Sequence, residues 1–240
     1  MLNLSKLLCP ICGSTEFNDF NGRPLAQCAS CKSLERTRLM WMILNSVEIL
    51  KPGIRVLHVA PEVSLIHPLK KICGDLYHPC DIDPKKYKNK HVEIFSIDLC
   101  VDLFKMPSKN FDLIIHNHVL EHLPCVIGPV IHQIHRILKV NGMHLFSVPF
   151  IGEKTEEDLN PNLTDEVRRR RFAQFDHMRI FGTDDFPRFL DNEFGGDVKL
   201  VPLNKIFTEA QLLKASVPVS VLTEISGHSF FSKSPVALGV

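Results

Sequence analysis

The stretch from Arg55 to Val148 constrains the fold most, because short apolar runs alternate in it with helical patterns. Apolar residues recur at helical spacing from Ile127 to Leu138, and Asn141-Gly142 is expected to end that helix. Strands that alternate with helices predict a parallel sheet with helices on both faces, so the fold class is α/β, doubly wound and Rossmann-like. Five apolar runs predict its buried strands: Arg55–Ala60, Leu76–Cys80, Val92–Ile97, Phe111–His116 and Met143–Val148.

Some connections in this pattern are irregular. The helix expected over Val63–Ile72 contains Pro68, which favours a kink or an early stop. The polar link from Asp83 to Lys90 is shorter than an ordinary parallel crossover, so it predicts a single helical turn or an irregular strand pair. Residues 150–180 are expected to be an insertion, with a mobile polar loop (Gly152–Leu163) and a helix that Thr164 or Asp165 caps. The last expected elements are a helix at Phe186–Leu190, a strand at Asp197–Leu203, a helix at Thr208–Ala215 and a strand at Gly227–Ser232.

Two C-x2-C pairs stand close to the N-terminus, Cys9 with Cys12 and Cys28 with Cys31, about fifteen residues apart. This spacing is typical of zinc ribbons, in which four thiolates surround one Zn²⁺ tetrahedrally. Four protein ligands leave no open position, so the pattern predicts a structural zinc site at residues 1–32. A redox pair or a chance spacing is the alternative.

A helix is expected to join this module to the main domain over residues 33–53. Ser33 is a candidate N-cap, and Lys51-Pro52-Gly53 ends the apolar pattern. Arg36 and Arg38 are expected on a solvated face, with a substrate or cofactor contact as the alternative.

The composition is that of a globular protein with a substantial core, since 45% of the 240 residues are hydrophobic. The net charge of +1 creates no overall basic field that would attract nucleic acid or a membrane. No run approaches the roughly 20 apolar residues of a membrane span, and the N-terminus lacks the apolar run of a signal peptide. These features predict a cytoplasmic protein with no membrane partner. In a reducing compartment the remaining cysteines are expected to be small buried hydrophobes: Cys73, Cys80, Cys100 and Cys125.

Three motifs between residues 55 and 150 together resemble class I S-adenosylmethionine-dependent methyltransferases of the small Rossmann-like kind. Val56–Glu62 stands where these enzymes have a glycine-rich first motif. Phe111–Leu123 resembles their fourth strand and the loop under the cofactor, and Arg136–Gly142 resembles the R-x-L-K-P-G-G helix stop. The resemblance implies a mostly parallel seven-stranded sheet, S-adenosylmethionine as cofactor, and a methyltransferase-like domain over residues 54–240.

A narrower resemblance extends over nearly the whole chain, to a subgroup of uncharacterised methyltransferases with an N-terminal zinc ribbon. Its motifs are C-x-S-L-E-R-x-R, V-L-H-x-A-P-E, H-x-L-E-H and F-x-Q-x-D-H-x-R-x-[YF]-G. Here these motifs lie at Cys31–Arg38, Val56–Glu62, His118–His122 and Phe172–Gly182.

The resemblance implies cofactor contacts at the ends of successive strands. Asp81 stands where an acidic residue binds the ribose hydroxyls, through charge-assisted hydrogen bonds. Asp98-Leu99 stands where a side chain and a backbone amide meet the adenine. His58 and Ala60-Pro61-Glu62 replace the usual acidic residue and G-x-G, and Glu62 is a candidate partner for the cofactor's ammonium. The implied cofactor-binding set is His58, Ala60, Pro61, Glu62, Asp81, Ile82, Asp98, Leu99, Asn117, His118 and His122.

Methyl transfer from a sulfonium needs mainly in-line positioning and, for a hydroxyl acceptor, a base. His177 is the first candidate base, with Asp176 or another carboxylate to orient its ring and Arg179 to hold an acidic acceptor. A structural histidine that holds the insertion to the sheet is the alternative. His118 is the second candidate for a catalytic role, together with His122.

The sequence is compatible with one leading function and three alternatives. The leading prediction is a methyltransferase that acts on an unidentified small molecule or glycan, at a hydroxyl or a similar group. A catalytically silent fold with a zinc-ribbon interaction module is the first alternative. A nucleic-acid methyltransferase is the second, with the arginine run Arg168–Arg171 as a docking surface rather than a solvated helix face; the neutral charge counts against it. A dehydrogenase is disfavoured because G-x-G-x-x-G is missing.

Overall fold

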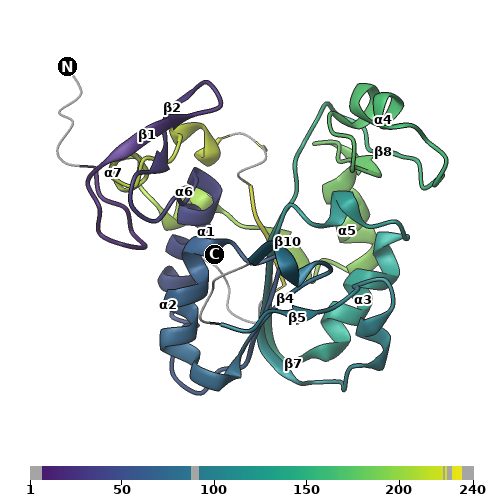
Figure 1. Ribbon diagram of the computed structural model, residues 1–240, viewed down its shortest axis with the longest axis horizontal. Helices are drawn as coiled ribbons and strands as arrows, with labels where there is room; N and C mark the ends of the chain where they lie inside the picture. Colours follow the sequence, from purple (N-terminus) through teal and green to yellow (C-terminus); the bar gives the residue numbers. More distant parts are fainter. Residues whose placement is uncertain (1–6, 88–91, 224, 226–228, 234–240) are drawn as a thin grey trace.

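The computed structural model describes residues 7–87, 92–223, 225 and 229–233, and a seven-stranded sheet forms its centre (Figure 1). The strand order is β10-β11-β7-β6-β3-β4-β5. The five strands β3 to β7 pair in parallel, and β11 is antiparallel to both β7 and β10. The predicted doubly wound, mostly parallel sheet is confirmed. Its strands are β3 (Val56–Val59), β4 (Tyr77–Asp81), β5 (Phe95–Ser96), β6 (Phe111–Asn117), β7 (Leu138–Ser147), β10 (Val198–Leu200) and β11 (Phe231–Lys233).

Helices cover both faces of the sheet, and each face has its own hydrophobic core. Successive side chains of a strand point to opposite faces, so Leu113 and Ile115 of β6 enter one core while Ile114 enters the other. The first core is closed by α1 (Glu35–Ser46), α2 (Val63–Cys73), α6 (Leu203–Ile206) and α7 (Glu209–Lys214), and the second by α3 (Ile127–Ile137) and α5 (Asp185–Phe194). Figure 1 shows α1 and α2 on one side of the sheet and α3 and α5 on the other.

The boundary between α3 and β7 differs from the prediction. The helix ends at Ile137 rather than at Asn141-Gly142, and β7 begins at once with Leu138. The cause is tertiary, because the turn before β6 takes the last helical carbonyl: the amide of Asn110 donates to the oxygen of Ile137 at 2.7 Å. Leu138 then pairs with Phe111, and the register shift that follows accommodates Asn141, whose φ is +66°.

Pro68 lies inside α2, and the helix continues to Cys73 because its apolar side chains stay buried on both sides of the proline. The short link after β4 contains a single 3₁₀ turn, Pro84–Tyr87, as predicted, and residues 88–91 lie outside the described part of the chain. The strand expected at Val92–Ile97 shrinks to Phe95–Ser96. Of the strand expected at Gly227–Ser232, residues 227 and 228 also lie outside the described part, and β11 extends to Lys233.

Two small sheets flank the central one. Strands β1 (Phe17–Phe20) and β2 (Arg23–Cys28) form an antiparallel ribbon in the cysteine module. In the insertion, β8 (Glu156–Glu157) pairs with β9 (Arg179–Ile180), so the segment expected to be a mobile loop contains a paired strand. Figure 1 shows the β1–β2 ribbon and the insertion with α4 (Asp165–Phe172) at opposite flanks of the molecule. Thr164 caps α4 as predicted, because its side chain accepts from the amide of Val167.

Arg38 ties the cysteine module to the main domain, which corrects the expectation of a solvated face. Its guanidinium is fully buried. It donates to the carbonyls of Ala26 and Ser33 in the module, at 3.0 and 2.6 Å, and to those of Ala215 and Ser216 after α7, at 2.7 and 2.5 Å. One side chain of α1 therefore joins segments about 180 residues apart in the chain.

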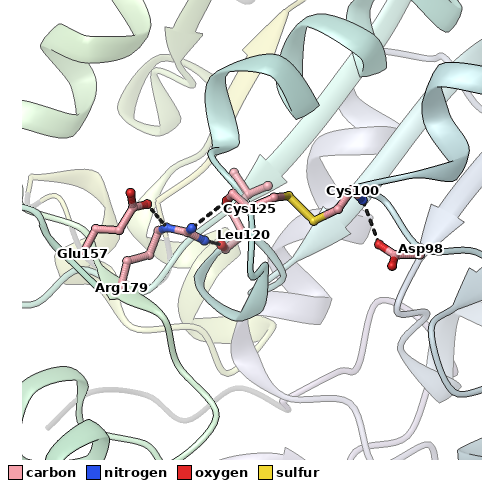
Figure 2. The surroundings of a disulfide bond; sticks show 6 residues. All are labelled: Asp98, Cys100, Leu120, Cys125, Glu157 and Arg179. Atoms are coloured by element: carbon pink, nitrogen blue, oxygen red, sulfur yellow. Dashed lines mark hydrogen bonds and ion pairs between the residues drawn. A yellow bond between two sulfur atoms is a disulfide. The ribbon is translucent and has the colours of Figure 1, made fainter. Parts of the chain in front are cut away.

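A disulfide bond between Cys100 and Cys125 also departs from the prediction (Figure 2). The sequence predicts small buried hydrophobic thiols at both positions. The chain brings them together because the loop after β5 meets the loop before α3, with a Cα–Cα distance of 6.1 Å. Cys73 and Cys80 are free and buried, as predicted. Within the described ranges, no helix combines the length and the apolar character needed to cross a bilayer.

Candidate functional site

The four N-terminal cysteines converge on one point, as their spacing predicts. Their sulfur atoms all lie within 4.8 Å of one another, with 3.6 Å between Cys9 and Cys31 and 3.6 Å between Cys12 and Cys28. A tetrahedral Zn²⁺ with Zn–S bonds of about 2.3 Å places its sulfur ligands about 3.8 Å apart, so the cluster fits this ion. The hydrogen bond between Cys9 and Cys31 lowers the pKa of the Cys9 thiol and raises the pKa of the Cys31 thiol, so this pair shares one proton, which a metal ion would displace.

The two turns that carry the cysteine pairs are similar, because a residue with positive φ follows each pair. Gly13 follows the first pair with φ +77°, and Lys32 follows the second with φ +62°. Ser33 does not cap α1, whose N-cap is Leu34 without a side-chain hydrogen bond. Its hydroxyl lies 3.1 Å from the sulfur of Cys31 instead, because the second turn directs it back toward the thiols.

The loop after β3 adopts a backbone conformation typical of glycine, although it contains no glycine. Ala60 adopts φ +47°, a left-handed conformation that glycine accepts most readily. Its amide donates to the carbonyl of Cys80, the next-to-last residue of β4, at 2.8 Å. The first motif therefore makes its tight turn without glycine, at the carboxyl edge of the sheet.

Glu62 connects the ends of β3 and β6. One carboxylate oxygen lies 2.9 Å from Nε2 of His58, and the other accepts from the side-chain amide of Asn117, whose own oxygen accepts from Ser147. Burial raises the pKa of Glu62, but the hydrogen bonds from His58 and Asn117 outweigh this effect and the pKa is lowered. His58 is fully buried and its other nitrogen lies 2.9 Å from the hydroxyl of Tyr77, so it orients Glu62.

Asp81 ends β4 as a nearly buried carboxylate. One oxygen accepts from the amide of Asp83 and the other from the hydroxyl of Tyr87, each at 2.8 Å. Burial and the hydrogen bond to Asp81 raise the pKa of Tyr87, so Tyr87 is a neutral donor. A carboxylate offers about four acceptor positions, so Asp81 retains capacity for further donors.

Asp98 organises the loop after β5. Its carboxylate accepts from the amide of Cys100 at 2.8 Å, and its own amide donates to Asp102. Figure 2 shows this bond beside the disulfide, which joins the loop to Cys125. Leu99 is buried. Loops that follow two different strands are therefore covalently connected at the carboxyl edge.

The loop after β6 carries a cluster of ionisable side chains. His118 adopts φ +52°, and its Nδ1 lies 3.5 Å from the carboxylate of Glu121. Glu121 is almost completely buried, and burial raises its pKa to about 8. Nε2 of His122 lies 4.0 Å from the same carboxylate. Sequence reasoning missed Glu121, although it stands inside the H-x-L-E-H motif, because nothing in that motif reveals which side chain turns inward.

His177 reaches this loop from the insertion. The amide of Met178 donates to the carbonyl of Glu121 at 2.7 Å, which fixes the two segments side by side. The ring of His177 meets that of His122 edge to face, with 4.7 Å between centroids. Its Nδ1 lies 2.9 Å from the carbonyl of Phe172, and burial lowers its pKa, so the imidazole is neutral. The predicted carboxylate partner, Asp176, lies 3.3 Å from Nδ1 of His122 instead.

The arginines near the site have structural roles. Arg179 is fully buried and donates to Glu157 and to the carbonyls of Leu120 and Cys125 (Figure 2), which leaves it badly placed to hold an acceptor. Arg168 is also buried and donates to the carbonyls of His177 and Asn160. Arg171 pairs with Glu156 and Asp158. The arginine run is therefore neither a uniformly solvated face nor a continuous basic patch.

The comparisons with known proteins agree with the topology. Residues 65–146, from α2 to β7, match a family described as a methyltransferase domain. No curated protein sequence matches the chain. A SAM dependent methyltransferase from Archaeoglobus fulgidus is 15% identical with a TM-score of 0.51, over 82% of this chain and 92% of that one. An S-adenosylmethionine dependent methyltransferase from Mesorhizobium loti is 13% identical with a TM-score of 0.50, over 81% and 95%. Together with the strand order, these matches show that the central sheet has the Rossmann-like fold of S-adenosylmethionine-dependent methyltransferases, with a match to a methyltransferase domain over residues 65–146 and a four-cysteine cluster before it that fits structural zinc.

Proposed function

We propose that the chain binds S-adenosylmethionine across the carboxyl ends of β3 to β6 and methylates a small molecule or glycan, at a hydroxyl or a similar group. The position of Asp81 carries this proposal. It is a buried carboxylate at the end of β4, next to the left-handed turn at Ala60 that follows β3. In open α/β sheets, ligands bind in the crevice outside these strand ends.

Each predicted cofactor residue has a role in this proposal. Asp81, with Ile82 beside it, accepts from the ribose hydroxyls. Asp98 and Leu99 meet the adenine. Glu62 accepts from the ammonium of the methionine part, and His58 positions Glu62 rather than touching the cofactor. Ala60 and Pro61 form the turn that approaches the cofactor, and the loop with Asn117, His118 and His122 runs beneath it.

The base for a hydroxyl acceptor is proposed to be His118 or His177. The side chain of His118 is 21% exposed and follows β6 directly, whereas His177 is 2% exposed and offers only Nε2. His118 is therefore the better placed of the two. We also propose a division into a ribbon at residues 1–32, a linking helix at 33–53 and the methyltransferase domain at 54–240. A cytoplasmic location stays a prediction of the sequence.

Calorimetric titration with S-adenosylmethionine and S-adenosylhomocysteine tests the cofactor site. Asp81→Asn keeps the size of the side chain and removes its charge, and we expect about ten- to hundredfold weaker binding, since hydrogen bonds to a charged group contribute about 1.5–3 kcal/mol. Asp75→Asn is the matched control, because Asp75 is a fully exposed carboxylate before β4. Equal affinity of both variants and the unmodified protein would refute the role of Asp81.

A catalytically silent fold is the second candidate. The contacts that favour it are the hydroxyl of Tyr87 on Asp81 and the engagement of both oxygens of Glu62 by His58 and Asn117. The same titration separates the two candidates. An unmodified protein that binds neither ligand at millimolar concentration is silent, and its ribbon then becomes the functional part.

A further inference from the structure

We infer that Glu121, His122 and His177 form a second metal site, which binds one divalent transition-metal ion with coordination positions left open. One ligand atom from each of these residues lies within 4.8 Å of the others. Two imidazoles and one carboxylate are the protein ligands of several catalytic zinc and non-haem iron sites, where three ligands leave room for substrate or water.

The two histidines are oriented as metal ligands are. A ligating histidine usually donates its other ring N–H to a carboxylate or a backbone carbonyl, which fixes the tautomer. Nδ1 of His177 lies 2.9 Å from the carbonyl of Phe172, and Nδ1 of His122 lies 3.3 Å from the carboxylate of Asp176. In both rings Nδ1 is thereby engaged by an acceptor, and Nε2 is the nitrogen left to bind an ion. The two acceptors are of different kinds, a backbone carbonyl and a carboxylate, and both belong to the insertion.

The carboxylate supplies an independent observation. Only about 1% of Glu121 is exposed, and among the described residues its Oε2 has no hydrogen-bond partner. An isolated buried carboxylate oxygen is costly, because it has lost its water without gaining a donor. A cation at this point would satisfy it. Oε1 of the same group lies 4.0 Å from Nε2 of His122, whereas the nitrogen and oxygen ligands of a tetrahedral ion lie about 3.4 Å apart, so a small inward shift of the exposed His122 ring would bring both atoms to one ion.

The surrounding chain holds the three ligands rigidly. Arg179 donates to the carbonyls of Leu120 and Cys125, on either side of Glu121 and His122 (Figure 2). The disulfide at Cys125 fixes the far end of this loop to Cys100. The bond from Met178 to the carbonyl of Glu121 fixes His177 against it. Rigid ligands lose little entropy when they bind an ion.

The site lies on the loop that follows β6, at the same edge as Glu62 and Asp81, because β3, β4 and β6 are parallel neighbours. An ion with open positions here would bind an oxygen-containing acceptor, such as a hydroxyl or a carboxylate. This choice of acceptor rests on the proposed function, whereas the binding of the ion does not.

Cobalt titration of the full chain, without any methyl donor, tests the inference. Co²⁺ in the four-cysteine cluster gives an intense thiolate charge-transfer band, which also reports that the module is folded, whereas a site of two histidines and one carboxylate gives no such band. We expect two Co²⁺ per chain by equilibrium dialysis and elemental analysis. His122→Asn should retain the full band and bind one ion, since His122 is the most exposed of the three ligands, at 36% of its side chain.

Two further variants sharpen this test. Glu121→Gln keeps the shape of the side chain and should weaken the second ion at least about tenfold, with the charge-transfer band unchanged. His132→Asn is the control, because His132 is an exposed histidine of α3 that pairs with Glu193, and it should bind two ions. One ion in the unmodified protein, or two ions of equal affinity in both His122→Asn and Glu121→Gln, overturns the inference.

Discussion

At the residue scale, individual buried polar side chains determine how the stability of the protein depends on pH. His116 is fully buried between β3 and β7, and its Nε2 lies 3.0 Å from Nε2 of His144. Burial lowers the pKa of His116 to about 3, because the charged imidazolium would lose its water there. Between pH 3 and pH 6.5, roughly, His116 is therefore mostly neutral in the folded protein and mostly protonated in the unfolded chain.

This shift predicts a loss of stability in weak acid. Between the unfolded pKa of about 6.5 and the folded pKa of about 3, the unfolded state binds more protons, so stability falls as the pH falls. From pH 7.5 to 5.5 the contribution of His116 amounts to about 1 kcal/mol. Burial also lowers the pKa of His135 and His144, so urea unfolding at both pH values should show at least this loss, and His116→Leu should reduce it by about 1 kcal/mol.

Ile114→Ala is the control, since Ile114 is a fully buried, non-titrating neighbour on the same strand. It should lower stability equally at both pH values. An unchanged pH dependence in His116→Leu would mean that His116 is not the group responsible.

At the scale of the elements, the insertion is held to the sheet by close backbone contact. Gly182 follows β9, and its amide donates to the hydroxyl of Thr155 at 3.1 Å. A Cβ at this position would lie 2.3 Å from the carbonyl oxygen of Glu153 and 2.5 Å from the carbonyl carbon of Lys154. Only glycine lets these two segments approach so closely, which explains the glycine at the end of the F-x-Q-x-D-H-x-R-x-[YF]-G motif.

Two glycine substitutions should therefore have opposite effects. Gly182→Ala forces the backbone apart and should destabilise the protein by about 1–3 kcal/mol. Gly128→Ala lies in α3, where a Cβ meets its nearest atom at 3.7 Å, and it should be neutral or stabilising by up to about 1 kcal/mol. Denaturant midpoints of the two variants provide the comparison. Similar midpoints would show that the backbone around Gly182 accommodates a Cβ without a loss of stability.

At the scale of the whole molecule, the cysteine module and the main domain are expected to unfold together. Arg38 donates to carbonyls of both parts, and the amide of Leu8 donates to the carbonyl of Lys214 at 2.7 Å. A guanidinium presents five donors in a fixed fork, whereas a lysine ammonium presents three from one point. Lysine is therefore a poor substitute at this junction.

Arg38→Lys should cost about 2–3 kcal/mol, because some of the buried carbonyls lose a charged donor. Calorimetry should show one unfolding transition in the unmodified protein and separate transitions, or a lower single one, in Arg38→Lys. Arg23→Lys is the matched control, since Arg23 is 41% exposed and pairs with Glu35 at 3.3 Å, and it should shift stability by less than about 1 kcal/mol. Two transitions in the unmodified protein would contradict this coupling.

Sequence patterns within short segments determined the sheet, the cysteine cluster and the position of one strand-end carboxylate. Strand–helix alternation specified the sheet, and the C-x2-C spacing brought four thiols to one point, because both depend on interactions within short segments. The motifs also located Asp81 at a strand end. These features were predictable since their partners lie within one or two elements.

Contacts between distant segments were decided only by the tertiary structure. The sequence does not show that Cys100 meets Cys125, that Arg38 reaches Ala215, or that His177 lies beside Glu121. It placed the end of α3 at Asn141-Gly142, where the sheet required a strand. A charged or reactive side chain has many possible partners, and only the packing of whole elements selects one of them. The strand-end carboxylate was therefore readable from the sequence, whereas the cluster of Glu121, His122 and His177 emerged only from the fold.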